Sequence, residues 1–188
     1  MTYIALGCVG FLFFYIFDWN KIRFVHRSLN AFFALGIITL AYATIGLLRT
    51  GTVSFTVPLP MRFLFLLFAF LSISLQFYAL FFALPFTDTY WNNGEKKKVI
   101  IRGIYGMCRH PGVLFFFFFY FFLWLGTGNH LVLVAAVMWT AMDVLHVYVQ
   151  DRWMFPKSLL HYEMYQQTTP FLLPTRNSLK ALQPSEER

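Results

Sequence analysis

Two ionisable residues, Arg109 and His110, stand directly before Pro111 and a nearly unbroken run of aromatic residues. Charged side chains are costly to place near lipid, so this position indicates a function. Pro111 suits the first position of a helix, and it biases His110 toward an extended backbone. The pattern predicts a sharp turn into a membrane helix, where a guanidinium could clamp a carboxylate and an imidazole could move a proton. The structural alternative is a snorkelling Arg109 and a capping His110.

A second group of polar residues lies in a later apolar segment. Asp143, His146 and Gln150 are spaced i, i+3 and i+7, so they share one face of a helix. Ionisable residues in a membrane helix usually face a bundle interior, a cavity or one another, and His146 is a further candidate base. The simpler interpretation is an Asp143–His146 pair that joins two helices. Asp151 follows at the expected interface, where a solvated carboxylate explains it equally well and its substitution would barely change stability.

The composition places these residues in a membrane protein. The chain has 188 residues, of which 59% are hydrophobic and 12% charged. Soluble domains carry roughly 25% charged residues. A formal charge of +7 would indicate nucleic acid in a soluble protein, but the positive-inside rule accounts for it here, so no nucleic-acid partner is expected. Cys8 and Cys108 have no metal-ligand spacing, and no metal is expected.

Five apolar segments predict an all-α bundle of about five membrane helices. The segments are 2–17, 31–48, 61–84, 112–125 and 131–149. A full span needs about 20 residues, so the fourth segment is short. It either extends through Gly126 and Thr127 or forms a re-entrant hairpin with the fifth. Of the 15 Lys and Arg residues, only Arg49 and Arg62 fall on one side of this arrangement. The asymmetry predicts an outside N-terminus and a cytoplasmic C-terminus.

The long polar segments therefore fall on the cytoplasmic side. One is 85–111, in which the residues at 92–94 predict a turn. The other is the tail that begins at Gln150. Within this tail we expect a short helix at 157–167 and an apolar clip at 170–174 that touches the bilayer or the bundle.

We expect one domain, 1–174, with its catalytic-type region at 99–174 and a cytoplasmic C-terminal cap. The remaining residues, 175–188, form a polar tail that is expected to fray. Ser72 and Gln76, four residues apart, suggest hydrogen bonds between helices. The polar groups together predict a pocket at the cytoplasmic mouth of the third to fifth segments. Such a pocket suits a polar cofactor that enters from water and a lipophilic substrate that enters from the bilayer.

An ordered set of motifs follows the same stretch of the chain. It consists of a Gly-x-Tyr, an Arg-His-Pro, a helical hairpin, a polar pair, two tyrosines three residues apart and a Pro-x-x-x-Pro clip. The residues are Gly103, Tyr105, Arg109, His110, Pro111, Gln150, Asp151, Tyr162, Tyr165, Pro170 and Pro174. In this order and spacing, the region from Arg102 to Pro174 resembles the isoprenylcysteine carboxyl methyltransferase-like family. That family also includes phospholipid N-methyltransferases.

The resemblance implies S-adenosylmethionine held in a cytoplasm-facing pocket, without a Rossmann domain and beneath the C-terminal tail. No GxGxxG, P-loop, HExxH or GxSxG motif occurs in the chain. The acceptor would be lipophilic or amphiphilic, such as a prenylcysteine-like carboxylate or a lipid head group. Asp151 would hold the donor's ammonium group and Arg109 would clamp a carboxylate. The implied catalytic residues are Arg109, His110 and His146. The implied cofactor-binding residues are Gly103, Tyr105, His110, Pro111, Gln150, Asp151, Tyr162 and Tyr165.

The chain also departs from the family pattern. Gln150 and Asp151 stand where the family has paired Glu, and Val113 and Phe115 replace a Tyr and a Gly. These departures leave open a non-catalytic membrane scaffold of the same fold. A third possibility is a membrane-embedded sterol or enone reductase that uses NADPH and shares the Arg-His-Pro. Those enzymes usually continue with Asn, whereas this chain has Gly112.

Overall fold

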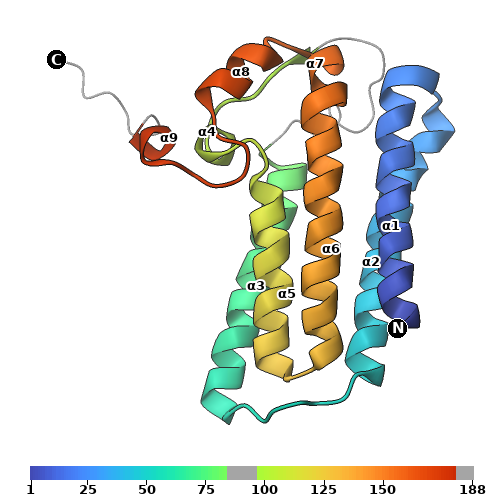
Figure 1. Ribbon diagram of the computed structural model, residues 1–188, viewed down its shortest axis with the longest axis vertical. Helices are drawn as coiled ribbons and strands as arrows, with labels where there is room; N and C mark the ends of the chain where they lie inside the picture. Colours follow the sequence, from blue (N-terminus) through green and yellow to red (C-terminus); the bar gives the residue numbers. More distant parts are fainter. Residues whose placement is uncertain (84–96, 181–188) are drawn as a thin grey trace.

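The computed structural model describes residues 1–83 and 97–180, and this part of the chain is mostly helical (Figure 1). α1 packs on α2 and α6, and α5 packs on α3 and α6. These five long helices form the bundle: α1 (Thr2–Trp19), α2 (Ala31–Thr50), α3 (Leu59–Phe81), α5 (Pro111–Thr127) and α6 (His130–Val149). The architecture agrees with the predicted all-α membrane bundle.

Four described segments are long and apolar enough to cross a membrane, and α5 is a shorter apolar helix of 17 residues. The four segments are Thr2–Phe24, Arg27–Thr50, Leu59–Phe81 and His130–Ser158. The chain therefore has the helices of a multi-pass membrane protein. Its fourth apolar segment extends through Gly126 and Thr127.

Short elements gather mainly at one end of the bundle (Figure 1). β1 and β2 form a parallel two-stranded sheet, which joins the segment before α4 to the tail. The elements are η1 (Asn20–Phe24), η2 (Arg27–Asn30), β1 (Lys97–Lys98), α4 (Ile104–Met107), η4 (Gln150–Met154), α7 (Phe155–Ser158), β2 (Leu159–Leu160), α8 (Tyr162–Thr168) and α9 (Arg176–Lys180).

The single helix expected at 157–167 is wrong. α7 ends at Ser158, β2 follows, and α8 begins only at Tyr162. Between them His161 has a left-handed backbone with φ of 62°. The pairing of β2 with β1 therefore breaks the helix. The turn predicted at 92–94 and the last eight residues of the expected polar tail lie outside the described residues.

The α5–α6 hairpin has clear local signals. Pro111 occupies the first turn of α5, where its missing N–H costs nothing. Gly128 ends the helix with φ of 67°, and a Cβ there would lie 2.2 Å from the carbonyl oxygen of Phe55. Asn129 then caps α6, because its side chain accepts a hydrogen bond from the amide of Leu131 at 3.0 Å.

This hairpin turn meets the connection between α2 and α3. Val53 and Asn129 form an antiparallel bridge, and the amide of Ser54 donates to the carbonyl of Gly128 at 2.8 Å. The side-chain amide of Asn129 donates to the carbonyl of Leu47 at 2.8 Å. The α5–α6 turn and the α2–α3 connection thus occupy the same end of the bundle, opposite the short elements (Figure 1).

Close packing in the core joins α1 and α2 to α6 and α5. Trp139 of α6 is 0% exposed and donates its indole N–H to the carbonyl of Ile4 at 3.0 Å. Gly7 leaves room for this ring, because a Cβ there would lie 2.1 Å from it. The hydroxyl groups of Thr44 and Tyr120 lie 2.7 Å apart and link α2 to α5. These contacts join α1 to α6 and α2 to α5.

Candidate functional site

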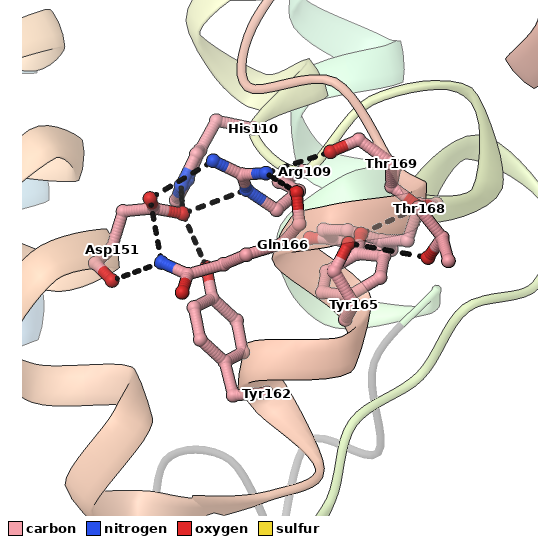
Figure 2. Close-up of polar contacts among 9 residues, drawn as sticks. Arg109, His110, Asp151, Tyr162, Tyr165, Gln166, Thr168 and Thr169 are labelled. Carbon is pink, nitrogen blue, oxygen red and sulfur yellow. Dashed lines mark hydrogen bonds and ion pairs between the residues drawn. The ribbon is translucent and has the colours of Figure 1, made fainter.

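Arg109 lies in the connection between α4 and α5, with only 10% of its side chain exposed. Its Nε and Nη2 donate to the two carboxylate oxygens of Asp151 at 2.8 and 3.0 Å (Figure 2). Its Nη1 donates to the carbonyls of Gln166 and Thr169 at 2.8 and 2.7 Å. The guanidinium carbon also lies 5.7 Å from the ring centroid of Phe171. Arg109 therefore links the α4–α5 connection to η4 and to the tail, and the snorkelling interpretation is wrong.

Asp151, in η4, is the centre of this network and is only 3% exposed. Besides Arg109, its carboxylate accepts hydrogen bonds from the Tyr162 hydroxyl at 2.6 Å and from Gln166 Nε2 at 3.0 Å. His110 Nε2 lies 3.2 Å from the same carboxylate. Gln166 Nε2 also donates to the backbone carbonyl of Asp151 at 2.8 Å. The expectation of a solvated carboxylate at the interface is therefore wrong.

The apolar clip at 170–174 completes the attachment of the tail. The amide of Arg109 donates to the carbonyl of Pro170 at 2.9 Å, and the amide of His110 donates to that of Phe171 at 3.2 Å. The clip thus contacts the bundle at the Arg-His-Pro motif. Residues that the sequence identified separately, in the loop and in the tail, meet here.

Three tyrosines fasten α4 and α8 to the bundle. The Tyr105 hydroxyl donates to the carbonyl of Ala79 in α3 at 3.0 Å, and the Tyr165 hydroxyl donates to the carbonyl of Tyr105 at 2.5 Å. Burial raises the pKa of Tyr105, of Tyr165 and of Tyr162 above the ordinary tyrosine value. Their hydroxyl groups therefore stay protonated and act as hydrogen-bond donors.

His110 precedes α5 and is 6% exposed. Its ring stacks on Phe155, with centroids 6.0 Å apart, and meets the edge of Phe171 at 5.0 Å. Burial lowers the pKa of His110, although the nearby Asp151 opposes that shift. His110 is therefore largely neutral near pH 7, so it can take up a proton.

A second polar cluster joins α1 to α6. His146 Nε2 lies 2.7 Å from Oδ2 of Asp18, and Gln150 Nε2 donates to the same oxygen at 2.6 Å. The ring of His146 also packs edge-on against Tyr15, with centroids 4.8 Å apart. The Asp143–His146 ion pair suggested by the spacing does not form, because the imidazole of His146 bonds to Asp18 instead. Among the described residues, Asp143 has no hydrogen bond or ion pair.

A cavity of about 1360 Å³ connects the two clusters. It is lined by side chains from all five long helices, so it is wider than the pocket predicted between the last three segments. Apolar residues such as Phe11, Leu40 and Phe119 form much of its wall. Charged and polar residues line it toward the end where the tail packs. The cavity can thus receive a ligand with a long apolar part and a polar part.

Most of the residues predicted for the site line this cavity. Gly103 and Asp151 do not, because Gly103 precedes α4 with open space around it and Asp151 faces the tail. The predicted residues that line the cavity are Tyr105, Arg109, His110, Pro111, His146, Gln150, Tyr162 and Tyr165.

Asp18 was not identified from the sequence as a site residue, and Ser72 and Gln76 were expected only to form hydrogen bonds between helices. Among the described residues these bonds do not form, since the Ser72 hydroxyl donates within α3 to the carbonyl of Phe68 at 2.8 Å. Asp18 lies just beyond the end of the first apolar segment, and its position near that end was the signal available. Gln76 lines the cavity from α3, and its Oε1 is buried without a hydrogen-bond partner.

No protein-family model, curated protein or solved structure matches the chain. What the chain does must therefore follow from the geometry of the cavity and of the two polar clusters.

Proposed function

We propose that the chain is an integral membrane methyltransferase that uses S-adenosylmethionine and acts on a lipophilic or amphiphilic acceptor. The observation that carries this proposal is the cavity of about 1360 Å³. Its walls are apolar along the helices, and its end beneath the tail is lined by tyrosines, imidazoles and a carboxylate. Both a polar cofactor and an apolar acceptor fit such a space.

The membrane arrangement in this proposal has five spans, with the N-terminus outside and the C-terminal cap in the cytoplasm. α5 has 17 residues and is about 25 Å long at a rise of about 1.5 Å per residue. Its turn contacts the α2–α3 connection, which supports a full crossing rather than a re-entrant hairpin. The connections at the other end of the bundle, where the tail packs (the capped end), carry the excess of Lys and Arg. This excess favours the cytoplasm for the capped end.

The residues at the capped end fit the methyl donor. S-adenosylmethionine supplies an electrophilic methyl group on a positively charged sulfur. The aromatic rings of Tyr105, Tyr162 and Tyr165 line the cavity and offer faces for that charge and for the adenine. Asp18 offers a carboxylate for the ammonium group, since both of its hydrogen bonds go to Oδ2 alone. Lys98 lines the same end and offers a cation for the donor's carboxylate.

Arg109 and Asp151 have a different part in this proposal. Their hydrogen bonds to each other and to the tail occupy the groups that would otherwise hold the donor. Contact between Asp151 and the donor's ammonium therefore requires an exchange of partners. In the arrangement described, the pair holds the tail over the cavity and keeps water from the reacting groups.

Two imidazoles line the cavity as candidate bases. His146 is oriented by Asp18, and an imidazole fixed by a carboxylate is a common arrangement for proton transfer. His110 is neutral near pH 7 because burial lowers its pKa. We propose His146 as the base for an acceptor that must lose a proton, with His110 as the alternative.

The proposal is tested by calorimetric titration of purified protein in detergent with S-adenosylhomocysteine and, separately, with NADPH. We expect S-adenosylhomocysteine to bind and NADPH not to bind. Asp18→Asn should weaken S-adenosylhomocysteine binding about tenfold or more, since a hydrogen bond to a charged group contributes about 1.5–3 kcal/mol. Glu163→Gln, an equal change of charge at an exposed position of α8, should leave binding unchanged. Binding of NADPH alone would indicate a reductase, and binding of neither a scaffold.

A further inference from the structure

The cations and the carboxylates that line the cavity lie at different depths. Among the described residues, the lining cations Lys21, Arg27, Lys98 and Arg109 all come from the connections at the capped end. The long helices contribute no Lys or Arg to the described lining. They contribute the carboxylates of Asp18 and Asp143 and the imidazole of His146. The lining cations therefore lie in the connections at the capped end, and the lining carboxylates lie up to about two turns deeper, in α1 and α6.

Asp143 is the deepest of these carboxylates. It lies six residues before the end of α6, or about 9 Å along the axis. It lines the cavity, and within the described chain it has no hydrogen bond or ion pair, whereas Asp18 already binds His146 and Gln150. An ionisable group at such a depth without a hydrogen bond is costly. A ligand that supplies the hydrogen bond would remove that cost.

Gln76 provides an independent observation on the opposite wall. Its Oε1 is buried without a hydrogen-bond partner, and it lies 3.2 Å from the position that a Cβ on Gly112 would occupy. Gly112 and Asp143 stand at nearly equal separations before and after Gly128, the turn of an antiparallel hairpin. Gln76, Gly112 and Asp143 therefore lie at about the same depth. Oε1 of Gln76 is itself buried against α5, so the acceptor that faces the cavity at this depth is the carboxylate of Asp143.

We propose that this level of the cavity binds the head group of an amphiphile that carries N–H or O–H donors, an amine or a hydroxyl rather than a carboxylate. A carboxylate head would be repelled by the carboxylate of Asp143, which also cannot donate a hydrogen bond to it. An ammonium or a hydroxyl can donate a hydrogen bond to Asp143. The apolar tail would lie against α2 and α5, where Ile37, Leu40 and Phe119 line the cavity.

As a statement about the methyl acceptor, this inference rests on the proposed function, because it chooses among the acceptors that the methyltransferase proposal leaves open. As a statement about binding, it is independent of the methyl donor. The head-group preference is therefore measured without that donor.

The experiment compares three amphiphiles with the same tail: hexadecylamine, hexadecanol and hexadecanoate. Each is titrated at pH 7.5 into the purified full-length protein in detergent, and the bound fraction is measured by native mass spectrometry. We expect hexadecylamine to bind at least tenfold more tightly than hexadecanoate, with hexadecanol between them. Asp143→Asn should remove most of the difference between amine and carboxylate. Gln76→Leu, which keeps Asp143, should leave the amine bound more tightly than hexadecanoate.

Glu163→Gln is the matched control, since it removes one carboxylate from an exposed position outside the cavity. Equal binding of hexadecylamine and hexadecanoate to the wild type would overturn the inference, and so would a preference that survives in Asp143→Asn. If the Asp143→Asn variant does not fold, the order of affinities of the three amphiphiles in the wild type and in Gln76→Leu still tests the inference. Binding of S-adenosylhomocysteine without a head-group preference overturns this inference alone. A head-group preference without that binding overturns the methyltransferase instead.

Discussion

At the scale of single residues, Arg109 and Asp151 form a buried ion pair whose remaining polar atoms are also satisfied. An ion pair repays the cost of leaving water only when its geometry is good and its other hydrogen bonds are made. Here the guanidinium donates to two backbone carbonyls, and the carboxylate accepts from Tyr162 and Gln166. The pair therefore fastens the tail to the start of α5.

Asp151→Asn should release the tail without unfolding the bundle. The substitution leaves the guanidinium of Arg109 buried without its counter-charge, which costs about 3 kcal/mol or more. The tail contains trypsin sites at Lys157 and Arg176, and cleavage there reports its open population. We expect cleavage to be roughly a hundredfold faster than in the wild type.

The exposed Glu163→Gln serves as the control, because it makes the same chemical change on α8 away from the network. A tail that is equally resistant to trypsin in Asp151→Asn and in this control would show that the ion pair does not hold it.

The sequence could single out members of this network but not their contacts. Arg109 and His110 were identifiable because charged groups are costly near lipid. The burial of Asp151 was not, because it depends on donors that come from both sides of the α5–α6 hairpin. Asp18 was missed for a similar reason. Its partner His146 is 128 positions away, and no local spacing relates the two.

At the scale of helices, the approach of α1 to α6 decides whether the second polar cluster can form. Hydropathy predicted the five long helices to within a few residues of their observed ends. It could not predict which of them touch, because their apolar residues occur on all faces. The contact depends on Gly7, which admits the ring of Trp139. This contact brings Asp18 to the level of His146 and Gln150.

Gly7→Ala should therefore destabilise the bundle and separate these helices. The added Cβ would lie 2.1 Å from the buried ring of Trp139, and overpacking of this kind costs about 1–3 kcal/mol. The better helix propensity of Ala returns at most about 1 kcal/mol. We expect a lower melting temperature in detergent, measured by tryptophan fluorescence. Ala5→Leu adds bulk at an exposed position of the same helix and should not change it. Equal melting of Gly7→Ala and wild type would refute this packing.

At the scale of the whole molecule, the two ends of the bundle differ. One end carries the cap, both polar clusters and most of the positive charge. At the other end, the α2–α3 connection pairs with the α5–α6 turn. The charge asymmetry was readable from the sequence, whereas the pairing of the two connections was not, since it joins segments more than 70 positions apart. This pairing bears on whether α5 crosses the membrane.

Single cysteines at Thr52, His130 and His161 test this arrangement, because all three residues are exposed and lie outside the long helices or at their very ends. The native Cys108 should not interfere, since it is fully buried and burial raises its pKa to about 11. An impermeant maleimide added to intact cells should label Thr52→Cys and His130→Cys but not His161→Cys. Labelling of His161→Cys should require lysis.

The comparison of the first two positions decides how α5 lies in the membrane. The Val53–Asn129 bridge places Thr52 and His130 at the same end, so both cysteines should react from the same side. A re-entrant α5–α6 hairpin would instead leave His130→Cys unreactive in intact cells while Thr52→Cys reacts. If His161→Cys alone reacts from outside, the bundle is inserted in the opposite sense. The cavity mouth would then face away from the cytoplasm, where S-adenosylmethionine is made, and the methyltransferase proposal would fail on topology alone.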